Sequence, residues 1–164
     1  MKFRAVKIVA FSAALASTAT LMVACAPIVP MQASEDANNP ACANVIVRLP
    51  DVVAGEDRRY TNAQATGAWG DGAVQLVCGV EPSGPTTDTC VNVNGVDWVI
   101  DDSAAPIYRF EPYGRTPGIA VYVDSEQVSG TETTVDLNAV VQQLPQDRQC
   151  TTLSDTFDVP EAKQ

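Results

Sequence analysis

The stretch CVNVNGVDWVI, residues 90–100, constrains the fold of this chain more than any other. Its central Asn94-Gly95 is the strongest two-residue signal for a β-hairpin, because a type I′ turn needs positive φ at both positions. The expected register sets Val93 opposite Val96, Asn92 opposite Asp97, Val91 opposite Trp98 and Cys90 opposite Val99. One face then holds Val91, Val93, Val96, Trp98 and Ile100, and the other holds Asn92, Asp97 and Asp101. A slip of one residue would mix the two sets, so the sequence predicts an antiparallel sheet with one apolar face.

Three further segments are typical of strands. GAVQLVCGV, residues 72–80, places Val74, Leu76 and Cys78 on one side of a strand. IYRF, residues 107–110, and GIAVYV, residues 118–123, flank the turn-forming stretch EPYGRTP and predict a second hairpin.

Two segments have helical spacing and end before a proline. The first begins with Asn39 as cap and Pro40 in the first turn, and its apolar positions are Cys42, Val45, Ile46 and Leu49. The second is expected to have Asp136 as its cap, with apolar positions Leu137, Val140, Val141 and Leu144. Helices of about ten residues need a surface to cover. We therefore predict an α+β domain: an antiparallel sheet of four to five strands, with an N-terminal and a C-terminal helix on one face and two disulfides.

The N-terminus has the form of a secretory signal, with Lys2, Arg4 and Lys7 before an apolar run of residues 8–24. This run is at the lower limit for crossing a bilayer. Cleavage after Ala26 would place Pro27 next to the cut, where signal peptidases generally fail. Met22-Val23-Ala24-Cys25 resembles a bacterial lipobox, in which the cysteine sulfur receives a diacylglyceryl group. We therefore expect lipidation at Cys25, with secretion and a retained membrane anchor as the alternatives.

This interpretation divides the chain into four parts. Residues 1–24 are a lipoprotein signal peptide, 25–39 a flexible tether of on the order of 45 Å when extended, 40–150 a single α+β domain, and 151–164 a polar tail. Removal of residues 1–24 takes away three cations and changes the formal charge from −10 to −13. Such acidity opposes nucleic-acid binding, which depends on neutralising phosphates. We expect attachment to the extracytoplasmic face of the cell membrane through lipid, and an envelope protein or cell-wall ligand as partner.

Four cysteines remain when Cys25 is acylated, an even number outside the cytoplasm. Three pairings are possible. Cys78 ends one strand and Cys90 opens the next, while Cys42 and Cys150 belong to the two helical ends of the domain. We therefore expect Cys78–Cys90 and Cys42–Cys150. Metal binding is disfavoured because the spacings are wide and the chain has no histidine.

Five segments together resemble an actinobacterial family of secreted proteins and lipoproteins, the domain of unknown function numbered thirty-five fifteen. They are NNPACANVIVRLPDVVAGEDRR, ATGAWGDGAVQLVCGV, CVNVNGVDWVI, YGRTPGIAVYV and a late LP…C, spanning about Asn38 to Cys150. The resemblance implies an envelope protein of Gram-positive, high-GC bacteria. It supplies no activity, cofactor or catalytic residue.

The residue types disfavour most catalytic chemistry. Without histidine the chain lacks the commonest general base and both the Ser-His-Asp and Cys-His arrangements. The candidates for ligand or partner binding are Trp69 and Asp71 in AWGDG, and Tyr113 and Arg115 in YGRTPG. Each also has a structural interpretation, as a core anchor, a turn cap or an ion pair. We expect a non-catalytic binding module with no cofactor or metal. The alternative is an enzyme, or enzyme subunit, of envelope assembly that gathers Asp71, Asp101 or Asp102 with Arg115 in a cleft.

Overall fold

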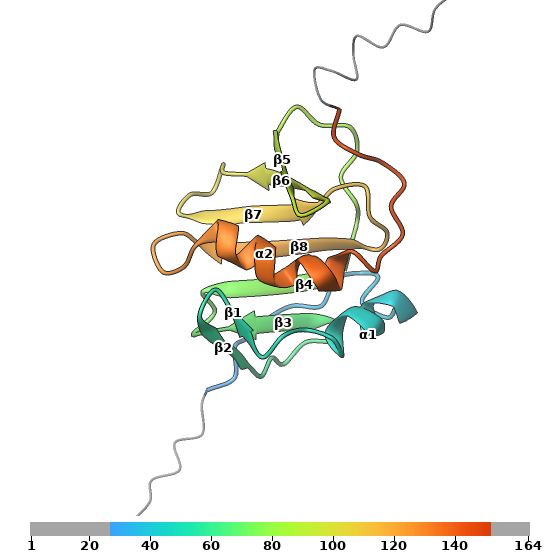
Figure 1. Cartoon of the computed structure of the whole chain (residues 1–164). Coiled ribbons are helices and arrows are strands. Elements are labelled where there is room, and N and C mark those ends of the chain that lie inside the picture. The colour runs from blue at the N-terminus through green and yellow to red at the C-terminus, as the bar shows by residue number, and fades with distance from the viewer. Residues whose placement is uncertain (1–26, 152–164) are drawn as a thin grey trace, which may run out of the picture.

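The computed structural model describes residues 27–151, which form one antiparallel eight-stranded sheet and two helices (Figure 1). The elements along the chain are α1 (Pro40–Ile46), β1 (Val52–Val53), β2 (Glu56–Arg59), β3 (Thr66–Trp69), β4 (Val74–Val80), β5 (Thr89–Val93), β6 (Val96–Asp101), β7 (Ile107–Pro112), β8 (Gly118–Asp124) and α2 (Gly130–Val141). In space the strands follow the order β1-β2-β3-β4-β8-β7-β6-β5. The first four strands therefore form one half of the sheet and the last four form the other, and β4 and β8 join the halves.

The prediction of four to five strands was wrong, because β1, β2 and β3 lack a strand pattern. β1 has two residues, and all four residues of β3 are buried, so neither shows alternation. β3 also contains Gly67, and glycine weakens the strand signal. Here a Cβ at Gly67 would come within 2.6 Å of Leu49 Cδ1, so the glycine makes room for the segment that follows α1.

The hairpin of β5 and β6 has the predicted register. Val93 pairs with Val96, and Val91 pairs with Trp98. The other two expected pairs, Asn92 with Asp97 and Cys90 with Val99, are also formed. Asn94 and Gly95 have φ of 49° and 84°, the left-handed values that a type I′ turn requires. The predicted hairpin of β7 and β8 is also present.

The first helix begins as expected, with the Asn39 side chain accepting a hydrogen bond from the N–H of Ala41 at 3.0 Å. The second begins seven residues earlier than predicted. Ser129 is its N-cap and accepts from the N–H of Glu132 at 3.3 Å, a Ser-x-x-Glu pattern. Asp136 lies inside the helix, where its carboxylate accepts from the N–H of Ala54 at 2.8 Å. That contact ties α2 to the turn between β1 and β2.

Both helices contribute to one hydrophobic core on one face of the sheet. In Figure 1, α2 lies across this face in front of β8 and β4. Its nearest strands by backbone contact are β1, β5 and β6, and α1 contacts β4. The core combines Cys42 and Val45 of α1 with Leu137, Val140 and Val141 of α2, and with Trp69, Val74, Leu76, Cys78, Trp98 and Val121 of the sheet. The two helices share one sheet face, as predicted, and Trp98 lies on the predicted apolar face of the β5–β6 hairpin.

The opposite face of the β5–β8 half is partly covered by a loop without regular secondary structure. The β4–β5 loop crosses it and carries Ser83, whose N–H and hydroxyl both donate to the Glu111 carboxylate at 2.7 and 2.6 Å. Arg109 adds an ion pair to the same carboxylate at 2.7 Å. Glu111 is 1% exposed, so these three donors satisfy a buried charge. The loop thus shields the part of the polar face around Glu111 from water.

The disulfides join Cys42 to Cys78 and Cys90 to Cys150, so the expected pairing was wrong. Side chains alternate between the faces of a strand. Cys78 lies on the helix-covered face with Leu76, whereas Cys90 lies on the opposite face with Asn92. The two cysteines therefore point to opposite sides of the sheet. Cys42, on the buried stripe of α1, meets Cys78 directly beneath it.

The described part of the segment expected as a tether, residues 27–39, contacts the domain. Val29 forms a parallel bridge with Thr61, and the Ser34 hydroxyl donates to the carbonyl of Cys78 at 2.6 Å. Val29 and Ala37 are buried. The signal peptide, the expected lipidation site Cys25 and nearly all of the polar tail lie outside residues 27–151. Within that range no helix has the length and apolar character needed to cross a membrane.

Candidate functional site

An apolar groove of about 410 Å³ lies between α2 and the β5 edge of the sheet. The first turns of α2 form one wall with Gly130, Thr131 and Thr134, and Val91 and Val93 of β5 form the other. Its floor and one end are formed by Ile100, Tyr108, Phe110, Val123 and Ser125. Val91 is 38% exposed although it belongs to the apolar face. The groove is the part of that face that neither helix covers.

Two local contacts fix the walls of the groove. At one end, a Cβ on Gly130 would lie 2.6 Å from the Phe110 ring, so only glycine lets α2 begin this close to the sheet. At the other end, the Asn138 and Gln142 side chains of α2 donate to the carbonyl of Asn94 at 3.2 and 2.8 Å. The helix is therefore attached to the hairpin turn at its C-terminal end and to β7 at its N-terminal end, and the groove remains open between them.

The lining of the groove favours binding over catalysis. None of the residues that line it is charged, and their polar groups are hydroxyls. The Thr134 hydroxyl already donates to the carbonyl of Thr131 at 2.8 Å. Apolar clefts with a few polar groups are the usual form of binding sites. This groove can bury apolar side chains but offers no acid, base or nucleophilic pair.

The outer edge of β5 adds a second binding feature. Within residues 27–151, β5 is hydrogen-bonded to a strand on one side only, the side of β6. Because the residues that flank the turn exchange hydrogen bonds, Val93 and Val91 pair with β6, while Cys90 and Asn92 direct their backbone N–H and C=O outward. An unpaired edge of this kind can accept another strand. Such a strand would extend the wall of the groove.

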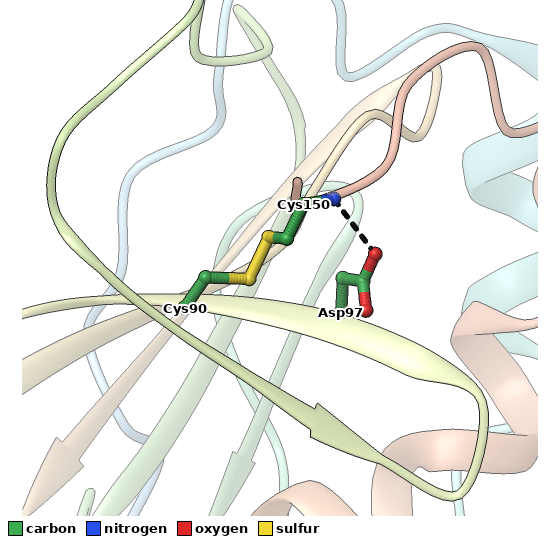
Figure 2. Close-up of side chains that lie close together, drawn as sticks. All are labelled: Cys90, Asp97 and Cys150. Carbon is green, nitrogen blue, oxygen red and sulfur yellow. Dashed lines mark hydrogen bonds between the residues drawn. A yellow bond between two sulfur atoms is a disulfide. The ribbon is translucent and has the colours of Figure 1, made fainter. Parts of the chain in front are cut away.

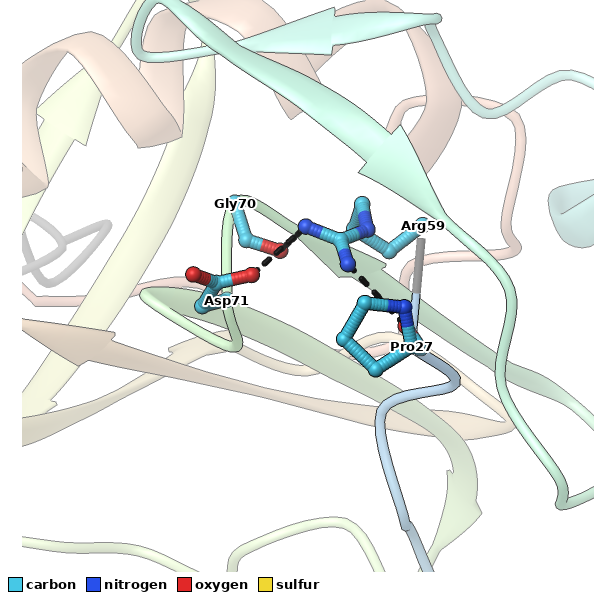
Figure 3. A network of polar contacts seen from close by, with 4 residues as sticks. All are labelled: Pro27, Arg59, Gly70 and Asp71. Carbon is cyan, nitrogen blue, oxygen red and sulfur yellow. Dashed lines mark hydrogen bonds and ion pairs between the residues drawn. The ribbon is translucent and has the colours of Figure 1, made fainter. Parts of the chain in front are cut away.

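The predicted residues Trp69 and Asp71 lie at the turn between β3 and β4. Trp69 is fully buried, and its indole N–H donates to the carbonyl of Pro50 at 3.0 Å. Asp71 forms an ion pair of 2.6 Å with Arg59 (Figure 3), and its side chain is 84% exposed. The structure therefore accounts for Trp69 as part of the core and for Asp71 as the partner of a β2 arginine.

The predicted residues Tyr113 and Arg115 lie beyond the other end of the strands, in the turn between β7 and β8. Arg115 is 5% exposed and donates to the carbonyls of Gln142 and Leu144 at 3.2 and 2.8 Å, just after α2. Burial lowers the pKa of its guanidinium, although nearby Asp97 acts in the opposite direction. Tyr113 is buried under Arg148, whose guanidinium lies 5.8 Å from the ring centre. Arg115 thus satisfies carbonyls at the end of α2.

The four predicted residues do not form one site, and neither do the carboxylates of the alternative enzyme. Trp69 and Asp71 lie at the end of the strands opposite to Arg115. Asp101 ends β6, four strands away from β3 in the sheet, and its carboxylate accepts from the N–H of Ser103 at 2.9 Å. Hydrogen bonding by the Ser103 side chain, together with this backbone N–H, holds the pKa of Asp101 below its usual value. The cleft required for carboxylate chemistry with Arg115 is therefore not formed by these residues.

One grouping of metal-ligating side chain types occurs within residues 27–151, namely Cys90, Asp97 and Cys150 (Figure 2). The two sulfurs are joined in a disulfide, so neither is a thiolate ligand. The Asp97 carboxylate accepts from the N–H of Cys150 at 2.9 Å. The cluster fastens the C-terminal segment to the back of the β5–β6 hairpin.

The fold and site define a two-layer α+β domain with an eight-stranded antiparallel sheet, two disulfides and an apolar groove. A family model described as Protein of unknown function (DUF3515) matches residues 3–150, and the chain belongs to this family. No curated protein matches the chain. No solved structure matches it.

Proposed function

We propose that this protein is a lipid-anchored module of the actinobacterial envelope that binds a polypeptide partner in the groove between α2 and β5. The exported state is supported by the N-terminal sequence, with its basic start, apolar run and lipobox-like Met22-Val23-Ala24-Cys25. The two disulfides agree with it, because disulfides persist in oxidising compartments.

One observation supports the proposed binding function: an uncovered apolar groove lies beside the unpaired edge of β5. An extended polypeptide can use both features at once, with backbone hydrogen bonds to Cys90 and Asn92 and alternate side chains placed toward Val91 and Val93. A cell-wall sugar would need more polar groups than the three hydroxyl-bearing residues and one tyrosine of the lining offer. A polypeptide is therefore the better fit.

The position of the groove agrees with this function. The described chain begins beside β2, whereas the groove lies at β5, six strand intervals away in the sheet. At about 4.8 Å per interval this separation is about 29 Å. An anchor at the N-terminal side would therefore leave the groove on the side away from the membrane, since β2 and β5 lie at opposite sides of the sheet (Figure 1).

The experiment places a photo-crosslinking amino acid at Val91 and, as a control, at Tyr122. Tyr122 is 37% exposed, close to the 38% of Val91, but lies on the opposite face of β8. Crosslinking in native membranes should give a discrete polypeptide adduct from position 91 and not from position 122. Equal adducts from both positions, or none from either, would contradict the groove as the binding site.

The anchor is tested separately with Cys25→Ser. This variant should leave the membrane fraction or remain unprocessed, as judged by detergent partitioning and mass spectrometry. Unchanged processing and partitioning would contradict lipidation while leaving the groove experiment intact.

A further inference from the structure

The first described residues, 27–31, are held against the domain by an isolated parallel bridge, and we call this segment the strap. The N–H of Val29 donates to the carbonyl of Tyr60 at 2.9 Å, and Val29 bridges Thr61 in parallel. The N–H of Met31 donates to the side chain of Asn62 at 2.7 Å. The Val29 side chain is 8% exposed. The strap therefore follows the end of β2 closely.

Arg59 clamps the outer end of the strap (Figure 3). One guanidinium nitrogen donates to the carbonyl of Pro27 at 3.0 Å, and the other donates to Asp71 at 2.6 Å and to the carbonyl of Gly70 at 3.3 Å. The Arg59 side chain is 16% exposed, so this clamp is largely shielded from water. It ties the strap to the turn between β3 and β4 as far out as Pro27.

Two large side chains beside the strap are left without packing. Ile28 is 59% exposed and Tyr60 is 83% exposed, although their chain neighbour Val29 is buried. Val29 alternates inward and Ile28 outward, and Val29 is hydrogen-bonded to Tyr60, so the two exposed side chains belong to one small surface. Tyrosine, with an apolar ring and a polar tip, favours the boundary between membrane and water.

The clamp also limits how far the domain can move from Cys25. Only Ala26 lies between Cys25 and Pro27 in the sequence, so the two residues are at most two residue steps, or about 7 Å, apart. The expected flexible tether of on the order of 45 Å is thus shortened to a few ångströms. A lipid on Cys25 would bring the strap, and with it Ile28 and Tyr60, to the membrane surface.

We propose that the strap edge, formed by residues 27–31 and Tyr60, lies on the lipid surface, with Ile28 and Tyr60 in the interfacial region. The inference rests on the proposed lipidation of Cys25. The acyl chains supply the membrane affinity, because the chain without residues 1–24 has a net charge of −13 and is repelled by anionic headgroups. Ile28 and Tyr60 supply the orientation, which turns the β5 edge toward partners.

The test bypasses cellular lipidation. All strands, both helices and both disulfides lie within residues 27–151, so a chain of residues 25–164 contains the whole fold. With both disulfides formed, its Cys25 thiol is coupled to a maleimide phospholipid in phosphatidylcholine vesicles. Tyr60→Trp reports the environment of the strap edge, because both natural tryptophans are fully buried and give a constant background. Tyr122→Trp, on the outer face of β8, is the matched control.

On coupling, Tyr60→Trp should show blue-shifted emission and be quenched by brominated lipid at least twofold more than Tyr122→Trp. Adding Ile28→Ser should reduce that quenching. Equal quenching at the two positions would overturn the proposed orientation. Because the lipid is attached chemically, a failure of Cys25 processing in cells would contradict the proposed anchor without changing this result.

Discussion

The two halves of the sheet differ in which face the chain covers. In the β1–β4 half, α1 and α2 cover the apolar face, and Trp69, Val74 and Leu76 are fully buried. In the β5–β8 half, the β4–β5 loop and the C-terminal segment cover the polar face around Glu111 and Asp97, and part of the apolar face remains open. Burial of apolar surface is the main stabilising term in folding. The open half therefore retains apolar area that can be buried by another molecule.

The largest expected contrast lies between the two disulfides. In the chain-entropy model each loop contributes about 4 kcal/mol to stability. Cys42 and Cys78 are fully buried, so replacing both with alanine should also leave a cavity. Replacing Cys90 and Cys150, which are partly exposed, should release mainly the C-terminal segment and cost less. Urea unfolding of both double variants measures the difference in the free energy of unfolding. A larger loss of stability for the Cys90/Cys150 variant would contradict this expectation.

A second contrast concerns single side chains of the apolar face. Trp69→Ala should cost about 3–5 kcal/mol, because it removes a large buried side chain. Val91→Ala, in the open groove, should change stability by about 0.5 kcal/mol or less. Both are measured by urea unfolding. A loss of several kcal/mol for Val91→Ala would mean that the groove is part of the core.

A third prediction concerns the ends of the two helices. Arg115→Ala removes buried charged donors from the carbonyls of Gln142 and Leu144, and should cost about 1.5–3 kcal/mol. The matched control is Arg48→Ala at the end of α1, where an exposed arginine donates to the carbonyl of Asn44. Its loss should be within about 0.5 kcal/mol. Equal effects in thermal or urea unfolding would show that burial of Arg115 contributes little.

The smallest expected effect is the titration of Asp101 in the open half. Ser103 stabilises the carboxylate, so the pKa of Asp101 lies below its usual value in the folded protein. The resulting stabilisation is present above the pKa of the unfolded chain and is lost as the pH falls through the folded pKa. Ser103→Ala should raise the pKa of Asp101, as measured by carbon NMR of the carboxyl group. An unchanged pKa would mean that the backbone N–H alone sets it.

The local features of the fold, such as the hairpin register, were predictable from the sequence. Which parts of the sheet the helices cover was not predictable. The register of β5 and β6 follows from Asn94-Gly95 and the alternation around it. β1 and β3 are too short or too uniformly buried to show a pattern, and the start of α2 is hidden by its run of β-branched threonines. The Ser129-x-x-Glu132 pattern was the signal that could have revealed that start.

The disulfides and the groove illustrate two different limits. The predicted register already placed Cys90 on the face of Asn92, opposite to Val91, so alternation could have excluded its pairing with Cys78. No comparable pattern in the sequence predicted the groove. Val91 and Val93 were predicted on an apolar face, and whether a helix covers them depends on where α2 lies, which is decided by distant contacts such as Gln142 with Asn94.

The two disulfides also give the chain a simple covalent topology. One closes a ring over residues 42–78 and the other over residues 90–150, so the two rings share no part of the chain. Each ring holds most of its own half. The first contains most of α1, β1–β3 and most of β4, and the second contains most of β5, β6–β8 and α2. Between them runs the exposed loop around Gly84. Cleavage of one peptide bond there would leave two internally crosslinked fragments with no covalent link between them, held together by the pairing of β4 with β8.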